Sequence, residues 1–239
     1  MKHSSNLFLV ISFFAISTAL YAAGEVKINT DLTVEADGTL VSSGNATVWN
    51  DINVYPGSTT SGGSNAPSWA LFKKNAAATS QGVFLWSFSN STEQEVYFQV
   101  QLPHGYKEGT TLYPHVHWTT FSTDPTGSTV DWALEYTIIK IGGTFGTTTM
   151  ISGSTPIVAP TAVGQHTITP LGTITSGADP NDLKISTVLV CRLFRNAVGG
   201  NAALHGGSDI DTYGAGVGLL GFDIHYESDM AGSRQEYIK

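Results

Sequence analysis

Two histidines separated by one residue, His115 and His117, have the spacing in this chain that best suits chemistry. On a β-strand, residues two apart project from the same face, so both imidazoles can reach one metal ion. Asp223, His225 and Glu227 alternate in the same way in a second stretch near the C-terminal end. If the two strands pair, the sequence predicts a metal site built from His115, His117, Asp223 and His225.

The segment Gly109-Thr-Thr-Leu-Tyr-Pro-His115-Val-His117 is similar to the first half of the cupin metal motif, a glycine and five residues before His-x-His. The cupin pattern continues with a glutamate three or four residues later, but Trp118-Thr-Thr-Phe-Ser follows here, and no second half appears downstream. A polar strand face, with histidines hydrogen-bonded at a sheet surface or subunit contact, explains the same residues. A cupin-like metal-binding protein is therefore an alternative hypothesis. Apart from this divalent metal, no cofactor is predicted.

Five tryptophans offer a second kind of site, because exposed aromatic rings can stack on sugars. Trp118 and Trp132 fall on apolar strand faces, which favours core packing for both. Trp49 and Trp69 flank loop-rich sequence and are the candidates for exposed, ligand-binding aromatics. They support a secreted carbohydrate-binding module as an alternative function.

The sequence gives little support for a calcium loop or for a catalytic site. Asp209-Ile-Asp211 hints at a calcium loop, but it lacks the further ligands and closing glutamate of an EF-hand, so a glycine-rich surface loop explains it better. The patterns Gly-x-Ser-x-Gly, His-Glu-x-x-His and the phosphate-binding loop are all missing from the sequence. No catalytic residues are predicted, and the chain is not expected to be an enzyme.

Charge and cysteine content restrict the partners. The 239 residues carry a formal net charge of −8, and only 13% are charged, so the basic surface that nucleic-acid binding needs is lacking. Cys191 is the only cysteine, so an internal disulfide is impossible. It lies in an apolar run, which predicts a buried side chain.

Alternation of apolar and polar residues with period two predicts an all-β fold. Turn sequences such as Pro56-Gly57 and Gly142-Gly143 separate about ten short strands, with no β-α alternation. The sequence thus predicts an antiparallel β-sandwich of the jelly-roll type. The best helix candidate, Ala70–Ala78, is short. The predicted strands are Thr47–Val54, Gly82–Phe88, Glu95–Leu102, Leu112–Phe121, Val130–Lys140, Thr147–Ile151, His166–Ile174, Leu183–Arg195 and Gly218–Glu227.

The first 46 residues differ from the rest. Met1–Ala23 has a cationic start, an apolar stretch too short to span a membrane and small residues at its end, which predicts a cleaved secretory signal peptide. Gly24–Ala46 has few aromatics and cannot bury much alone. It is predicted to be an extended segment, either an oligomerisation strand or an edge strand docked on the same domain. The sandwich is predicted to span residues 47–239.

Several stretches together resemble a family of phage and prophage structural proteins, over about residues 47–239. They include Thr47-Val-Trp-Asn-Asp-Ile, Gln99-Val-Gln-Leu-Pro-His-Gly-Tyr-Lys-Glu-Gly-Thr, Val130-Asp-Trp-Ala-Leu-Glu-Tyr and Gly221-Phe-Asp-Ile-His-Tyr-Glu. The resemblance implies a fibre-like or virion-surface jelly roll, forming a trimer, with no catalytic residues to carry over. A signal peptide is unusual for a virion component and favours a version that a cell exports.

Taken together, these features predict an exported, non-catalytic structural or adhesive protein that assembles with itself at the cell surface or outside the cell. The expected partners are further copies of the chain, in a trimer or filament, and a surface glycan. Nucleic acid and an integral membrane span after signal cleavage are not expected.

Overall fold

Sixteen strands and two short 3-10 helices form the part of the chain that the computed structural model describes, residues 26–27, 30–62, 65–121, 127–153, 157–158, 163–175, 183–197, 211–233 and 235–238. No helix in these ranges is long and apolar enough to cross a membrane. The strands are β1 (Val26–Lys27), β2 (Leu32–Val34), β3 (Leu40–Ser42), β4 (Val48–Val54), β5 (Thr60–Ser61), β6 (Ser68–Lys73), β7 (Val83–Phe88), β8 (Glu95–Gln101), β9 (Tyr113–Thr120), β10 (Thr129–Val130), β11 (Trp132–Ile139), β12 (Thr149–Ser152), β13 (Ile157–Val158), β14 (Thr167–Pro170), β15 (Val188–Arg195) and β16 (Val217–Ser228).

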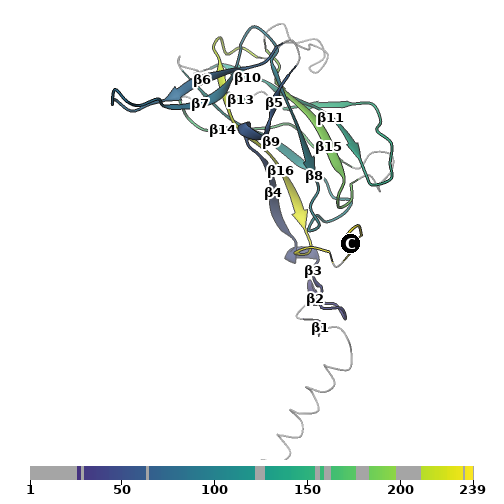
Figure 1. Ribbon diagram of the computed structural model, residues 1–239. Helices are drawn as coiled ribbons and strands as arrows, with labels where there is room; N and C mark the ends of the chain where they lie inside the picture. Colours follow the sequence, from purple (N-terminus) through teal and green to yellow (C-terminus); the bar gives the residue numbers. More distant parts are fainter. Residues whose placement is uncertain are drawn as a thin grey trace, which may run out of the picture.

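Two antiparallel sheets make up the body of the molecule (Figure 1). One has the order β12-β11-β15-β8-β5, and the other the order β14-β9-β16-β7-β6, with β4 also beside β16. Eight of these strands pair as nested hairpins, β7 with β16, β8 with β15, β9 with β14 and β11 with β12. Pairing the first strand with the eighth, the second with the seventh and so on inward is the topology of a jelly roll. The predicted antiparallel jelly-roll sandwich is confirmed.

The core lies between the two sheets, and the alternation seen in the sequence decides which side chains enter it. On β8, Val96, Phe98 and Val100 are buried while Tyr97 and Gln99 face solvent. Aromatic rings join the layers at 4.8–4.9 Å between centroids, in the pairs Phe98–Phe222 and Phe88–Trp132. Trp118 and Trp132 are fully buried, as predicted, and so is the Cys191 thiol.

A buried ion pair stabilises one end of the sandwich. Arg195, at the end of β15, donates two hydrogen bonds to the Asp211 carboxylate, at 2.7 and 2.8 Å, and both side chains are completely buried. Residues 211–214 form a loop, as predicted, with Thr212 and Gly214 exposed, but Asp211 itself is buried. Its carboxylate neutralises a core guanidinium, which a search for calcium ligands in the sequence could not detect. Asp209 lies outside the described residues.

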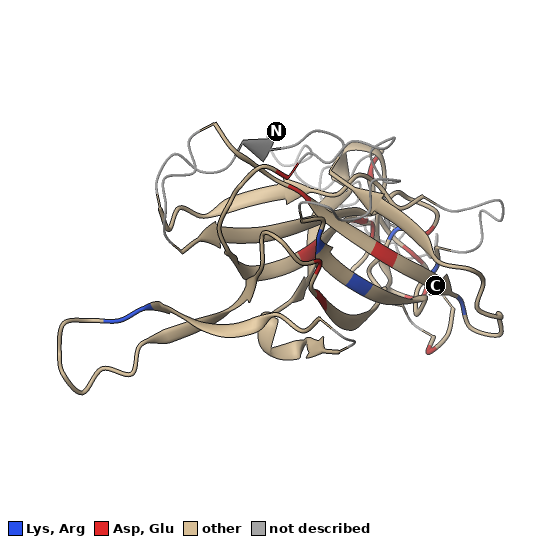
Figure 2. Ribbon diagram, turned by 90° about the horizontal axis from the view of Figure 1, so that it is seen from above, with Lys and Arg blue, Asp and Glu red and all other residues tan. Residues whose placement is uncertain are grey.

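The hairpin of β6 and β7 projects from the sandwich as an arm (Figures 1 and 2). The helix predicted over Ala70–Ala78 is wrong, because Ser68–Lys73 forms strand β6 and pairs with β7. Cross-strand partners decide the conformation here: Trp69 lies opposite Trp86, with ring centroids 4.9 Å apart. Tertiary pairing overrides the local preference of an alanine-containing stretch without glycine or proline.

Strands β1, β2 and β3 form a small antiparallel meander at the end of β4 (Figure 1). Among described residues, it meets the sandwich where Ser42 donates a backbone hydrogen bond to Asp229 (2.6 Å) and Val41 bridges to Met230. The predicted signal peptide, Met1–Ala23, lies outside the described residues, and its cleavage stays a prediction.

Candidate functional site

The histidine and aspartate residues predicted from the sequence meet on the outer face of the β9–β16 pair. Val116 and Trp118 of β9 point into the core, so His115 and His117 between and beside them point outward. On β16, Phe222 and Ile224 are likewise buried. The register places His115 directly opposite Asp223 and leaves His225 on the same face.

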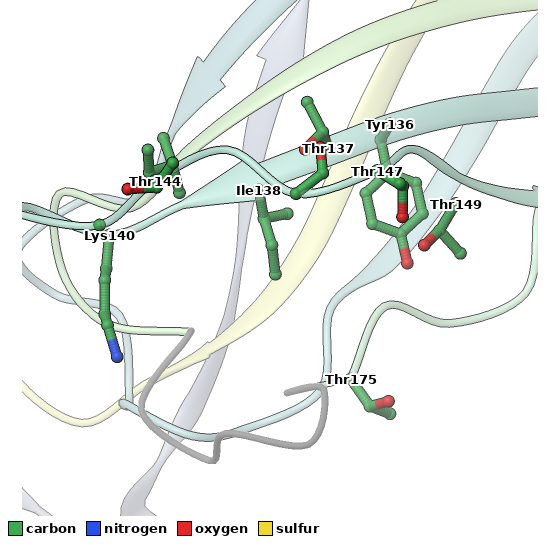
Figure 3. Close-up of a pocket in the computed structure, with 11 residues that line it drawn as sticks. Tyr136, Thr137, Ile138, Lys140, Thr144, Thr147, Thr149 and Thr175 are labelled. Atoms are coloured by element: carbon green, nitrogen blue, oxygen red, sulfur yellow. Dashed lines mark hydrogen bonds between the residues drawn. The ribbon is translucent and has the colours of Figure 1, made fainter.

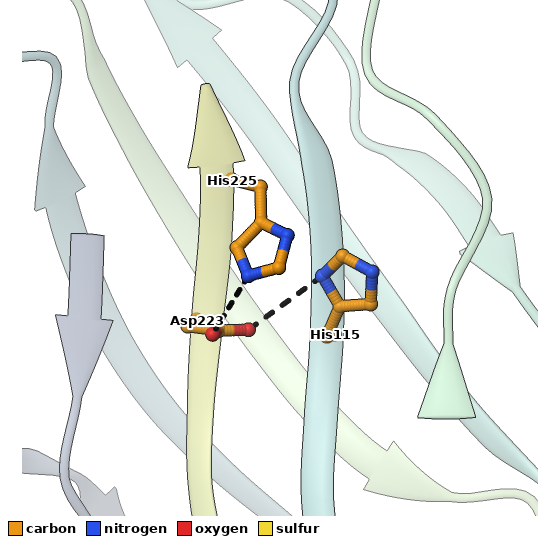
Figure 4. Close-up of side chains that lie close together, drawn as sticks. All are labelled: His115, Asp223 and His225. Atoms are coloured by element: carbon orange, nitrogen blue, oxygen red, sulfur yellow. Dashed lines mark ion pairs between the residues drawn. The ribbon is translucent and has the colours of Figure 1, made fainter. Parts of the chain in front are cut away.

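These side chains converge on the Asp223 carboxylate. His115 Nδ1 lies 3.6 Å from Asp223 Oδ1, and His225 Nε2 lies 3.3 Å from Oδ2 (Figure 4). His117 Nε2 approaches the same Oδ2 atom at 3.2 Å. The imidazoles of His115 and His225 are tilted against each other with centroids 4.3 Å apart. We refer to His115, His117, Asp223 and His225 as the histidine cluster.

The carboxylate at the centre of the cluster is buried although it lies on an outer sheet face. Asp223 is only 5% exposed, because the surrounding imidazoles cover it. Neither Asp223 Oδ1 nor His115 Nδ1 has a hydrogen-bond partner among the described residues, and their separation of 3.6 Å exceeds hydrogen-bonding distance. Buried polar atoms are nearly always hydrogen-bonded, so two such atoms facing each other require an explanation.

Burial and neighbouring charge determine the protonation of His115. Removal from water lowers the pKa of the His115 imidazole below 6.5, and the positive charge that His225 can carry lowers it further, against an opposing effect of Asp223. The net effect favours the neutral form of His115. A neutral imidazole keeps a nitrogen lone pair that can bind a metal ion.

Two further residues, which the sequence did not predict as part of the site, contact the histidine cluster. Asp51 on β4 places Oδ1 3.2 Å from His225 Nε2, and His166, just before β14, places Nε2 2.8 Å from His117 Nδ1. Period two in Thr47–Val54 predicts the outward face of Asp51, but only the pairing of β4 with β16 reveals its neighbour. Glu227, which shares the strand face, instead forms an ion pair with Lys107 at 2.7 Å.

A cavity of about 230 Å³ adjoins the cluster on the side of His117 and His166. Its other lining residues include Tyr55, Gly221 and Phe222. His117 therefore borders both the cavity and the Asp223 carboxylate.

A larger cavity, of about 370 Å³, lies between β11 and the loop that follows it (Figure 3). Hydroxyl groups dominate its lining, which includes Thr137, Thr144, Thr147 and Tyr136. Lys140 is the only charged residue among the described residues that line it. No acid–base pair or metal ligand set is formed there by the described residues.

Both tryptophans predicted to be exposed lie at the surface. Trp49 is 60% exposed and packs edge-on against Tyr113, with ring centroids 5.4 Å apart, on the same outer face as the histidine cluster. Trp69 is 52% exposed and lies on the β6–β7 arm. The structure places these two rings on different parts of the surface, so they do not form one platform.

Comparison with known proteins assigns no family. No protein-family profile matches the sequence, and no curated protein matches it. Among solved structures, the chain is similar to dimeric latent PorU from Porphyromonas gingivalis (9% identity, TM-score 0.34, 77% of this chain and 13% of PorU). It is also similar to the xylan-binding module CBM15 (10% identity, TM-score 0.32, 74% of this chain and 96% of that module). A third similar structure is the VP2 subviral particle of infectious bursal disease virus (10% identity, TM-score 0.28, 87% of this chain and 50% of VP2). Likenesses this distant say nothing about function, and the resemblance to phage structural proteins stays a prediction.

Proposed function

We propose that this chain is an exported, non-catalytic β-sandwich that assembles with copies of itself into a surface structure with a structural or adhesive role. The observation that carries the proposal is the apolar stripe along the β6–β7 arm. This stripe consists of Trp69, Leu71, Phe84 and Trp86, which are cross-strand partners on one side of the hairpin.

The stripe continues the core-facing side of the sheet beyond the sandwich. Phe88, at the base of β7, is fully buried between the sheets and Trp86 is partly buried against the core. Further along the same side, Phe84 is 38% and Leu71 41% exposed. A sheet face that packs a core at one end and meets water at the other leaves apolar surface for another chain to cover.

A second copy of the chain is the occupant that suits this arm. An arm that reaches away from its own body can pack on a neighbouring subunit without steric conflict between the two sandwiches. The net charge of −8 spread over a weakly charged chain leaves the apolar surface as the main source of attraction. Repetition of one such contact gives closed rings, including trimers, or filaments.

Sedimentation velocity of a Leu71→Ser, Phe84→Ser variant tests this proposal. Full burial of such side chains contributes about 1.5–3 kcal/mol each, and about two-fifths of each remains exposed. The loss is then about 1 kcal/mol per residue, or roughly 30-fold in the association constant for the pair. The matched control is Ile141→Ser, Phe145→Ser, which removes two exposed apolar side chains away from the arm. Equal weakening by both variants would refute a specific role of the arm.

A second candidate function, binding of a surface glycan, is favoured by the exposed Trp49–Tyr113 pair. Aromatic rings that remain exposed beside hydrogen-bonding groups such as Asp51 can stack on a sugar ring. A glycan array with the wild-type chain and Trp49→Ala tests this candidate, with Phe145→Ala, which removes an exposed ring outside the arm, as the control. Signals that persist in Trp49→Ala contradict it.

A further inference from the structure

We propose that His115, Asp223 and His225 bind one divalent transition-metal ion, of the class of zinc, copper and nickel, on the outer face of the sandwich. This inference goes beyond the proposed function and does not depend on it. It rests on the convergence of three donor groups, on two buried polar atoms without hydrogen bonds, and on the chemistry of the donors.

The donor atoms already lie close to the positions that a metal ion needs. One nitrogen of each imidazole and one carboxylate oxygen lie within 4.8 Å of one another. Zinc binds nitrogen and oxygen at about 2.0–2.2 Å, which places donors of a tetrahedral site roughly 3.3–3.5 Å apart. His115 Nδ1 lies 3.6 Å from Asp223 Oδ1, and His225 Nε2 lies 3.3 Å from Asp223 Oδ2, so each imidazole faces its own oxygen of the carboxylate at close to this spacing.

The site is arranged so that an ion would satisfy groups that the protein leaves unsatisfied. Asp223 Oδ1 and His115 Nδ1 are buried and make no hydrogen bond within the part of the chain that the structure describes. A cation between them would accept a lone pair from each, whereas the protein alone leaves both with the cost of desolvation. This observation separates the histidine cluster from an ordinary polar strand face, in which each buried nitrogen has a partner.

The donor set indicates the class of metal. Two imidazoles and a carboxylate suit zinc, copper or nickel, while calcium and magnesium prefer oxygen ligands alone. His117 contacts the Asp223 carboxylate from the side of the cavity, and His166 holds its other nitrogen at 2.8 Å. A neighbour such as His166 orients the imidazole that it contacts. Asp51 Oδ1 lies 3.2 Å from His225 Nε2, the same atom that faces Asp223, and is therefore a further oxygen donor beside the site.

The experiment is a titration of the untagged, metal-free chain with zinc chloride alone in a calorimeter, repeated with cobalt chloride under visible absorption spectroscopy. The wild type is expected to bind one ion per chain, and cobalt is expected to give the absorption of a tetrahedral site. In His225→Ala and Asp223→Asn, affinity is expected to fall by about 100-fold or more, because loss of a neighbour of a ligand alone costs 10–100-fold. His104→Ala is the matched control, since His104 bonds Ser233 outside the cluster.

His225 is the half-exposed member of the cluster, so its removal leaves the core intact. Far-UV circular dichroism of each variant checks this, and Asp223→Asn, which keeps the shape of the side chain, gives an independent result. Absence of zinc binding by the wild type overturns the proposal. So does binding by His225→Ala and Asp223→Asn that is as tight as in the wild type, or an equal loss in His104→Ala.

Discussion

Replacing Arg195 with methionine removes the cation from the buried pair with Asp211 and tests how the sandwich is stabilised. The guanidinium donates two hydrogen bonds to the carboxylate, at 2.7 and 2.8 Å. It also donates to the backbone oxygens of Tyr213 (2.6 Å) and Ala215 (2.7 Å), so it joins the end of β15 to the segment before β16.

The expected loss is large because Asp211 stays behind. Both side chains are fully buried, so the Asp211 carboxylate loses its counter-ion in a place that water does not reach. Removal of one partner from a buried ion pair costs about 3–5 kcal/mol, whereas replacement of both partners by apolar residues is often neutral. We therefore expect Arg195→Met to lower the free energy of unfolding by about 3–5 kcal/mol. Arg195→Met combined with Asp211→Leu should recover part of that loss.

Urea unfolding followed by tryptophan fluorescence, at one protein concentration, measures these differences. Lys107→Met is the matched control, because Lys107 pairs with Glu227 at a similar distance of 2.7 Å but about a third of each side chain is exposed. An exposed pair contributes at most about 1 kcal/mol. If Arg195→Met and Lys107→Met lose equal stability, burial is not what makes the Arg195 pair important, and the reasoning is refuted.

Three further predictions concern single positions. Burial raises the pKa of the Cys191 thiol to about 12. A thiol reagent at pH 8 should therefore leave the native chain unmodified and label it fully in urea. Rapid labelling of the native chain would contradict this prediction. Burial also raises the pKa of Tyr106 to about 12. The neutral Tyr106 hydroxyl contributes fully to the free energy of unfolding below pH 10. This contribution, about 2–3 kcal/mol, is lost as pH rises toward 12, because the hydroxyl ionises at lower pH in the unfolded chain than in the folded one. Denaturant titrations at pH 9 and 11.5 should thus show a smaller decrease in Tyr106→Phe than in the wild type. Gly82 has a φ of +81°, and Gly82→Ala would place a Cβ 2.7 Å from the Lys73 carbonyl oxygen and against Leu71. We therefore expect faster hydrogen exchange of the backbone amides in the β6–β7 arm. Gly57→Ala, whose Cβ meets open space, is the control.

The strands with the clearest alternation were predictable from the sequence. Val96, Phe98 and Val100 on β8 enter the core as predicted, because the two-residue period of a strand is a local property. The same rule placed His115 and His117 on one face and Asp223 and His225 on another. These two sets of side chains meet only because β9 pairs with β16. The sequence did not predict that pairing and could only state what would follow from it.

What the sequence did not reveal is non-local. Asp51 reaches His225 through the β4–β16 register, and His166 reaches His117 through the β14–β9 pair, and neither pairing is encoded within its own strand. The helix predicted over Ala70–Ala78 is wrong because it overlaps β6, whose pairing with β7 lies across a nine-residue loop and leaves no local signal. The exposure of Phe84 depends on where the opposite sheet ends, which no local pattern describes.

Sedimentation equilibrium of the secreted wild-type chain over a range of micromolar concentrations tests self-assembly most directly. We expect an average mass that rises with concentration to a whole multiple of the chain mass, or material that grows into filaments. A mass equal to one chain at every concentration would contradict it, because the apolar side of the β6–β7 arm would then stay in contact with water.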